Sequence, residues 1–209
     1  MKHFSRLMLC ALLSGCTMMP EGRTYAEYLN SLRLPVETSA EFPHCQNYDC
    51  ETYKLVALSD RDWRRIDRIF KPVSKNAAEE HRRIADAIGM FETIVGPLTG
   101  TQSDIKGTFR KTGEGQLDCV DESTNTTIYL SLLRQRGHLQ FHDILQPAMR
   151  TPFNGGGGRW IHQTAVIQEI KNRQRYVVDS WFHDNGANAE IVPFEDWANG
   201  WRPADWHES

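Results

Sequence analysis

Three residue types suited to thiol catalysis occur in chain order: Cys119, His162 and Asp179. A cysteine thiolate attacks carbonyl carbons, a histidine accepts the thiol proton, and a carboxylate fixes the imidazole tautomer. Asp118 directly precedes Cys119 and is a suitable N-cap, so we expect Cys119 to open a helix, whose N-terminus lowers a thiol pKa. Singly, each residue has a structural explanation as a buried cysteine, an interior histidine or a strand-end aspartate, and only the set of three indicates catalysis.

A predicted β-hairpin would bring the histidine and the aspartate together. The apolar run Ile161–Ile167 predicts a strand that carries His162 near its start. Tyr176–Val178 predicts the next strand, which ends at Asp179, and polar residues 171–174 supply the turn. In an antiparallel pair around this turn, the two side chains are expected near the open end, roughly cross-strand from one another.

The other elements are predicted from caps and apolar periodicity. The helix that Cys119 opens is expected to stop at Gly137, because one row recurs every four residues: Val120, Thr124, Ile128 and Leu132. Earlier helices are expected over Thr24–Leu34, from Ser59-Asp60 to Lys71-Pro72, and from Asn76 to a break at Gly96-Pro97. Residues 35–52 are expected to be irregular, and residues 99–117 to form a loop with a short strand near 108–110.

The second half of the chain favours extended structure. Besides the predicted hairpin, further strands are expected over Leu139–Leu145 and Ile191–Phe194. Trp197, Trp201 and Trp206 are expected to pack on the core. Helices followed by an antiparallel sheet, with the Cys119 helix packed against that sheet, make an α+β fold.

Three short motifs in this order carry a resemblance to a known family. They are Asp118-Cys119-Val120-Asp121-Glu122 opening a helix, Trp160-Ile161-His162 on a strand, and Val177-Val178-Asp179-Ser180-Trp181 on the next. They resemble the transglutaminase-like cysteine peptidase superfamily. They are most similar to the bacterial transglutaminase-like cysteine proteinases, whose nucleophile often sits in an Asp-Cys-Glu-Asp context. The resemblance covers about residues 108–185 and does not need the N-terminal helices.

The resemblance implies a papain-like α+β fold with Cys119 as the nucleophile, His162 as the general base and acid, and Asp179 as the orienting residue. It also implies attack on an amide through a thioester, resolved by water in a hydrolase or by a lysine amine in an acyl transferase. Hydrolysis suits the bacterial relatives better. The sequence assigns no oxyanion donor: the backbone N–H of Cys119 is the first candidate, and the side chain of Gln116 is a weaker one.

The chain departs from the family directly after the cysteine. Val120 stands where an acidic or aromatic residue often occurs, and Asp121-Glu122 only partly restores the acidic pair. Some relatives bind calcium near that pair. Because of this departure no cofactor is expected, and calcium is kept only as the alternative. The same departure supports an alternative function, in which a non-catalytic lipoprotein keeps the fold as a binding or assembly module.

The first sixteen residues are typical of an export signal. Lys2 and Arg6 form a basic front, residues 7–13 form an apolar run too short to cross a bilayer, and Leu-Ser-Gly-Cys ends at Cys16. This ending resembles the lipobox of bacterial lipoproteins. We therefore expect a signal peptide at 1–15, lipidation of Cys16, a tether at 16–23 and one domain at 24–209. Within that domain, N-terminal helices occupy 24–98 and the catalytic core 99–209.

The remaining cysteines fit an oxidising compartment. Cys10 lies in the signal, while Cys45 and Cys50 are spaced to close a short loop by a disulfide. A metal pair is the competing interpretation, but no second Cys/His pair lies nearby at zinc-ligand spacing. Cys119 is then the thiol left over. The predicted location is the bacterial envelope, lipid-anchored and facing the periplasm, at the outer membrane rather than the inner.

Composition limits the class of partner. The chain has 209 residues, enough for one well-cored domain, and a formal charge of −3 that does not favour nucleic-acid binding. The expected partner is a peptide or protein substrate in the envelope. A second set of side chains could make a metal site but lacks metalloprotease spacing: His138, His142, Asp143, His183 and Asp184.

Overall fold

The structure is a computed structural model that describes residues 24–109, 113–151, 161–204 and 206. Over these residues it is an α+β arrangement of helices and two antiparallel sheets, as the sequence predicts. The helices are α1 (Tyr25–Ser31), α2 (Asp60–Ile69), α3 (Ala77–Thr99), α4 (Cys119–Gln135) and α5 (Phe194–Ala198). The strands are β1 (Phe42–Gln46), β2 (Thr52–Val56), β3 (His142–Arg150), β4 (His162–Glu169), β5 (Arg175–Asp179) and β6 (Glu190–Pro193).

Some sequence-based predictions fall outside these residues. They concern the signal peptide at 1–15, lipidation of Cys16, the tether at 16–23 and the strand position of Trp160. None of the helices in the described ranges is long and apolar enough to span a bilayer.

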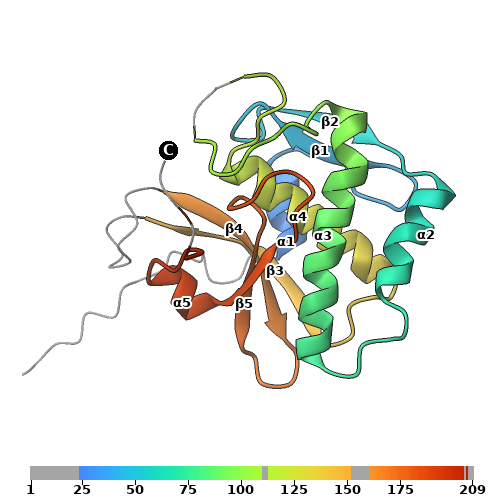
Figure 1. Ribbon diagram of the computed structural model, residues 1–209, viewed down its shortest axis with the longest axis vertical. Coiled ribbons are helices and arrows are strands. Elements are labelled where there is room, and N and C mark those ends of the chain that lie inside the picture. The colour runs from blue at the N-terminus through green and yellow to red at the C-terminus, as the bar shows by residue number, and fades with distance from the viewer. Residues whose placement is uncertain (1–23, 110–112, 152–160, 205, 207–209) are drawn as a thin grey trace, which may run out of the picture.

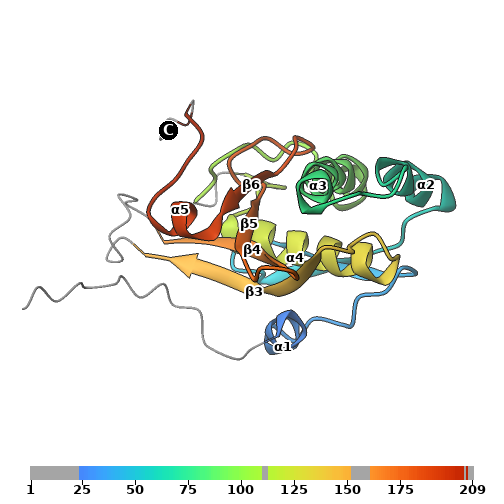
Figure 2. The ribbon, with the colours of Figure 1, turned by 90° about the horizontal axis from the view of Figure 1, so that it is seen from below.

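Helix α4 lies in the middle of the molecule, between the larger sheet and α3 (Figures 1 and 2). Asp118 caps it by accepting the backbone N–H groups of Val120 and Asp121, as predicted. Neighbouring elements cover it on every side, so even its polar residues are buried: Ser123, Thr124, Asn125, Thr126, Thr127 and Ser131. Their hydroxyl and amide groups bond to neighbouring elements and to the helix backbone, which lets a largely polar helix occupy the centre.

The larger sheet has the order β3-β4-β5-β6, with every neighbouring pair antiparallel. One face packs on α4 and α3 through residues such as Ala165, Ile167 and Val178. The other face carries Val166 and Val177, which pack under α5 in a smaller apolar cluster. The hairpin predicted around residues 171–174 is the β4–β5 pair, and it places the two candidate catalytic positions at one end of the sheet.

The N-terminal half contains a sheet that the sequence did not predict. Residues 35–52 were expected to be irregular, but β1 and β2 pair antiparallel, with Cys45 opposite Tyr53. Burial along β1 is nearly continuous, while β2 is mostly exposed, so neither strand shows the alternating pattern of a half-buried strand. Pro43 within β1 further masks the strand in the sequence.

Helix α3 does not break at Gly96-Pro97 as predicted. It continues to Thr99 and ends where Gly100 adopts a φ of 91°. A proline in the last turn removes only one helical N–H donor, and the left-handed conformation of Gly100 then ends the helix. No strand forms at Thr108 and Phe109, and the third residue of that predicted strand lies outside the described ranges.

Candidate active site

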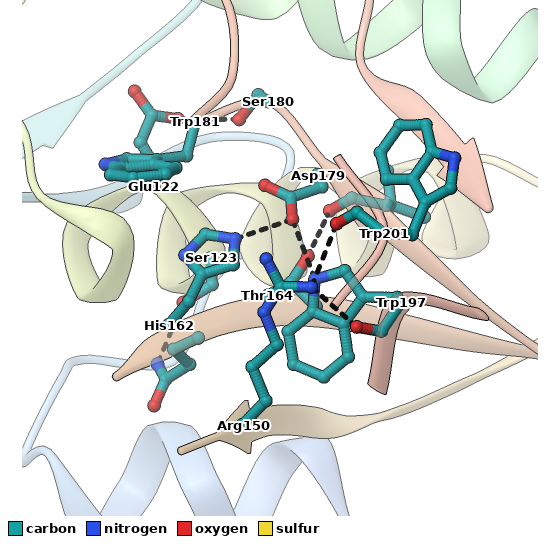
Figure 3. Close-up of polar contacts among 12 residues, drawn as sticks. Glu122, Ser123, Arg150, His162, Thr164, Asp179, Ser180, Trp181, Trp197 and Trp201 are labelled. Atoms are coloured by element: carbon teal, nitrogen blue, oxygen red, sulfur yellow. Dashed lines mark hydrogen bonds and ion pairs between the residues drawn. The ribbon is translucent and has the colours of Figure 1, made fainter. Parts of the chain in front are cut away.

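His162 and Asp179 form a buried hydrogen-bonded pair on adjacent strands (Figure 3). Nε2 of His162 lies 2.7 Å from Oδ2 of Asp179, and each residue is 2% exposed. The register pairs Ala165 with Val178; continued by one residue, it sets Asp179 opposite Thr164 and diagonal to His162. The pair meets because diagonal neighbours share one face of a sheet.

The carboxylate of Asp179 has a second donor. Nε1 of Trp197, in α5, donates to the same Oδ2 atom at 3.1 Å. Two N–H groups from different elements therefore fix this oxygen, and the imidazole that faces it is fixed in turn.

Cys119 lies in a small apolar cluster with Trp181 and Phe182. The ring of His162 contacts the same two side chains, with ring centroids 4.6 Å from Trp181 and 5.3 Å from Phe182. The thiol and the imidazole therefore share their aromatic surroundings. Nδ1 of His162 is buried and has no hydrogen-bond partner among the described residues. It is the ring nitrogen left for a thiol proton, because Nε2 is bound to Asp179.

Burial raises the pKa of the Cys119 thiol to about 12. The backbone N–H of Gln163 favours the thiolate, whereas the negative charges of Asp118 and Asp179 disfavour it. The backbone N–H of Cys119, at the helix N-terminus, does act to lower this pKa, but lost hydration outweighs it, so the low thiol pKa expected from the sequence is not found. At neutral pH the thiol, in a residue that is 8% exposed, is uncharged.

A disulfide-closed turn lies against the start of α4. The disulfide joins Cys45 and Cys50, as expected from their spacing. Inside it, four consecutive residues have left-handed φ values of 70°, 67°, 54° and 53°: Asn47, Tyr48, Asp49 and Cys50. Asn125 of α4 fixes the start of the turn, since its Oδ1 accepts from Cys45 N at 2.7 Å and its Nδ2 donates to Cys45 O at 3.1 Å.

The left-handed turn directs three successive N–H groups at carboxylates of α4. The amides of Tyr48 and Cys50 donate to the two oxygens of Asp121 at 2.8 and 2.9 Å. The amide of Asp49 donates to Oδ2 of Asp118 at 2.9 Å. Asp118 and Asp121 flank the cysteine and form the capping box of its helix. The turn, called here the disulfide clamp (residues 45–50), therefore positions the residue that carries the thiol.

Gln163 ties the histidine strand to the cysteine helix. Its Nε2 donates to Oγ of Ser123 at 2.8 Å and to the hydroxyl of Tyr28 at 2.9 Å. The same Tyr28 hydroxyl lies 2.8 Å from Oγ1 of Thr124. Helix α1 thus braces α4 and β4 together, next to His162.

A buried carboxyl pair lies at the far side of the aspartate. Ser180, directly after Asp179, donates to Oε2 of Glu122 at 2.7 Å. Asp104 hydrogen-bonds to Glu122, and its Oδ1 accepts the backbone N–H of Leu117 at 2.8 Å. Burial, together with the charge of Glu122, raises the pKa of Asp104 to about 9, so Asp104 holds a proton at neutral pH. The pair joins the loop before α4 to the end of β5.

Arg150, at the end of β3, anchors the chain that follows α5. Its guanidinium lies over the Trp197 ring, 4.9 Å from the centroid. Nη1 donates to the backbone oxygens of Trp197 at 2.5 Å and Trp201 at 3.0 Å (Figure 3). Arg150 is 8% exposed, so the C-terminal segment is tied to the edge of the site by a buried cation.

Gln116 has local partners on the loop before α4. Its Nε2 donates to the backbone oxygen of Ser103 at 2.9 Å, and its Oε1 accepts from the amide of Ile105 at 3.2 Å. These bonds shape the loop, and an oxyanion role for Gln116 stays a prediction.

The five side chains considered as a possible metal site each bind a different partner. His138 pairs with Asp67, His142 with Glu80, Asp143 with Arg134 and His183 with Glu190, while Asp184 accepts from the amide of Lys106. Across the described ranges, no group of three His, Cys, Asp or Glu side chains could hold a metal ion.

Sequence reasoning missed several residues that support the site. Trp197 was assigned only to packing, and Arg150 and Asp104 were not singled out. The density of tryptophans after residue 196 is the one signal in the sequence that pointed to this region: Trp197, Trp201 and Trp206.

Comparison with known proteins gives no relative. No protein-family model matches the chain, and neither the curated proteins nor the solved structures include a match.

Proposed function

We propose that this chain is a cysteine hydrolase of the peptidase or amidase type, with Cys119, His162 and Asp179 as a catalytic triad. The observation that carries the proposal is the state of His162. One ring nitrogen is held by Asp179, while the other is buried, unpartnered among the described residues and bordered by the aromatic pair that also borders Cys119. The papain-like, transglutaminase-like identity of the fold is part of the same proposal.

The proposed reaction uses each nitrogen of His162 once. Asp179 accepts from Nε2–H, which leaves the lone pair on Nδ1 free to take the thiol proton. The thiolate attacks the carbonyl carbon of an amide, and the C–N bond breaks as Nδ1–H protonates the leaving amine. Water then attacks the thioester, with His162 as its base, and releases the acid and the free thiol. The backbone N–H of Cys119 is the first candidate donor to the oxyanion.

The raised pKa of Cys119 fits a thiol that ionises only in concert with His162. A neutral thiol in an apolar setting is protected from adventitious oxidation and alkylation. Proton transfer to Nδ1 creates an ion pair whose positive partner is stabilised by Asp179. The triad therefore does not need a preformed thiolate.

The cellular setting belongs to the proposal as well. The Cys45–Cys50 disulfide is the structural support, because such bonds persist in oxidising compartments. With the N-terminal signal and lipobox pattern, it favours an envelope protein anchored by lipid at Cys16, acting on peptides or proteins without a cofactor.

One observation favours the non-catalytic alternative. Cys119 is 8% exposed and its thiol pKa is raised, as in a cysteine that serves only as a small core residue. A binding or assembly module would have these features without turnover.

An acyl-enzyme trap separates the two functions. The chain is incubated with p-nitrophenyl acetate, and the intact mass is followed over time in the parent, Cys119→Ala and His162→Ala. The proposal predicts one acetyl group on Cys119 that is lost again to water, with both variants inert. Acetylation absent from Cys119, or equally fast in His162→Ala, would support the module instead.

A further inference from the structure

The chain after α5 runs back across the candidate site. This C-terminal strap, residues 199–204 and 206, is held at its start by Arg150, which donates to the backbone oxygen of Trp201. Near its end, the amide of Trp206 donates to the backbone oxygen of Pro203 at 3.1 Å.

Trp206 packs against the cluster that contains Cys119. Its ring centroid lies 5.2 Å from that of Trp181 and 5.1 Å from that of Phe182, with planes at 39° and 82°. Gly107 forms the floor: a Cβ atom built there would come within 2.1 Å of the Trp206 ring. We call the surface formed by Gly107, Trp181 and Phe182 the Trp206 seat.

The backbone of Gly107 is built into this seat. Its φ of 75° favours glycine, and its amide donates to the backbone oxygen of Trp181 at 2.9 Å. The Trp206 seat therefore consists of the rings of Trp181 and Phe182 and of the Gly107 backbone, which a hydrogen bond ties to Trp181. Such a surface admits a flat aromatic side chain and leaves no room for a side chain of its own at position 107.

The two aromatic side chains of the seat also border Cys119 and His162. Trp181 and Phe182 both contact the His162 ring. Phe109, 37% exposed, continues the apolar surface outward, with its ring centroid 4.5 Å from that of Trp181. A ligand side chain bound in the seat would thus lie next to the reacting groups. Its binding would position the neighbouring amide of the substrate for attack by the thiol.

We propose that the seat is a subsite for an aromatic side chain of the substrate, and that Trp206 occupies it in cis. This inference rests on the proposed function and names its substrate class, peptides or proteins with an aromatic residue near the amide that is attacked. The strap then acts as an internal competitor. It also explains how a nucleophilic thiol comes to be only 8% exposed, since Trp206 packs on the cluster around it.

The test measures binding without turnover. In a Cys119→Ala background, N-acetyl-tryptophanamide is titrated into the full chain and into the same chain carrying Trp206→Ala, followed by NMR shifts of the Trp181 indole N–H. Removing the internal competitor should tighten binding about tenfold, the factor that one well-packed aromatic pair supplies. N-acetyl-alaninamide should bind neither protein measurably. Equal affinity for the tryptophan derivative in both proteins would overturn the proposal.

A second readout tests occlusion by Trp206. With the native thiol, Trp206→Ala should raise the rate of Cys119 alkylation by iodoacetamide about tenfold, whereas Trp206→Phe should raise it less. Arg202→Ala, an exposed change on the same strap, is the matched control and should leave the rate unchanged. An unchanged rate in Trp206→Ala refutes occlusion.

The hydrolase proposal and the Trp206 seat can be refuted independently. If no acyl-enzyme forms in the parent chain or in Trp206→Ala, but the tryptophan derivative binds more tightly to Trp206→Ala, the seat stands and hydrolysis is wrong. If acyl-enzyme forms while Trp206→Ala changes neither affinity nor alkylation, hydrolysis stands and the seat is wrong.

Discussion

Opening the disulfide clamp should loosen the first turn of α4 and with it the position of Cys119. The perturbation is the double change Cys45→Ser and Cys50→Ser, which leaves the rest of the turn unchanged. Without the bond, four consecutive left-handed residues must be held by hydrogen bonds alone. A left-handed conformation costs about 1–2 kcal/mol for each residue other than glycine. The turn should therefore relax and withdraw its N–H groups from Asp118 and Asp121.

The magnitude follows from two contributions. Cross-linking residues separated by 5 positions restricts the unfolded chain by about 2 kcal/mol in the chain-entropy treatment. Each of the three N–H bonds to the carboxylates contributes about 1.5–3 kcal/mol at full strength, of which a relaxed turn keeps a part. We expect the free energy of unfolding to fall by about 2–4 kcal/mol, which moves the urea midpoint by about 1–2 M.

The assay combines urea unfolding with hydrogen exchange of the amides of Val120 and Asp121. Both amides bond to Asp118 and should lose protection first. Tyr53→Ala is the matched control, because it changes an exposed residue of the same hairpin and keeps the disulfide; its unfolding free energy should stay within about 0.5 kcal/mol. If the unfolding free energy of the double variant also stays within about 0.5 kcal/mol of the parent value, and both amides remain protected, the role of the disulfide clamp is refuted.

Two further substitutions test the groups around Asp179. The pKa of Asp104 is about 9 when folded, above its usual 3.8, so its contribution to stability is present below pH 3.8 and lost as the pH rises towards 9. Asp104→Asn should flatten that decline in urea unfolding and add about 1.5–3 kcal/mol near the alkaline end, the scale of one hydrogen bond to a charged group. An identical pH slope would contradict this prediction. Trp197→Phe removes one donor to Asp179, and should lower the acylation rate at saturating ester about tenfold with an unchanged KM. A change in KM alone would show that Trp197 does not act through Asp179.

The sequence predicted those parts of the fold that depend on local chemistry. Asp118 caps α4, Ser59 caps α2, and the polar residues 171–174 turn β4 into β5, because caps and turns are chosen by adjacent residues. The pairing of His162 with Asp179 followed from the same turn. The observed register places the two residues diagonally and not directly opposite each other. The composition of the turn does not determine which of its residues pair, so the sequence could not predict this register.

The parts that the sequence did not predict depend on contacts between distant segments. The left-handed turn at Asn47 to Cys50 is held by the disulfide and by Asp118 and Asp121, which accept its N–H groups about 70 residues further along the chain. The raised pKa of Cys119 comes from burial under Trp181 and Phe182, which outweighs the local effect of the helix. The sequence next to Cys119 does not indicate that residues about 60 positions later bury it.

The most direct test of the catalytic proposal is the pH profile of Cys119 alkylation by iodoacetamide, located by peptide mapping in Trp206→Ala and in Trp206→Ala with His162→Ala. If Nδ1 of His162 takes the thiol proton, the single variant should react at neutral pH at least about tenfold faster than the double variant, a difference of about 1.4 kcal/mol. Equal rates in the two proteins, rising together through a pKa of about 8.5 as for a free thiol, would contradict the account.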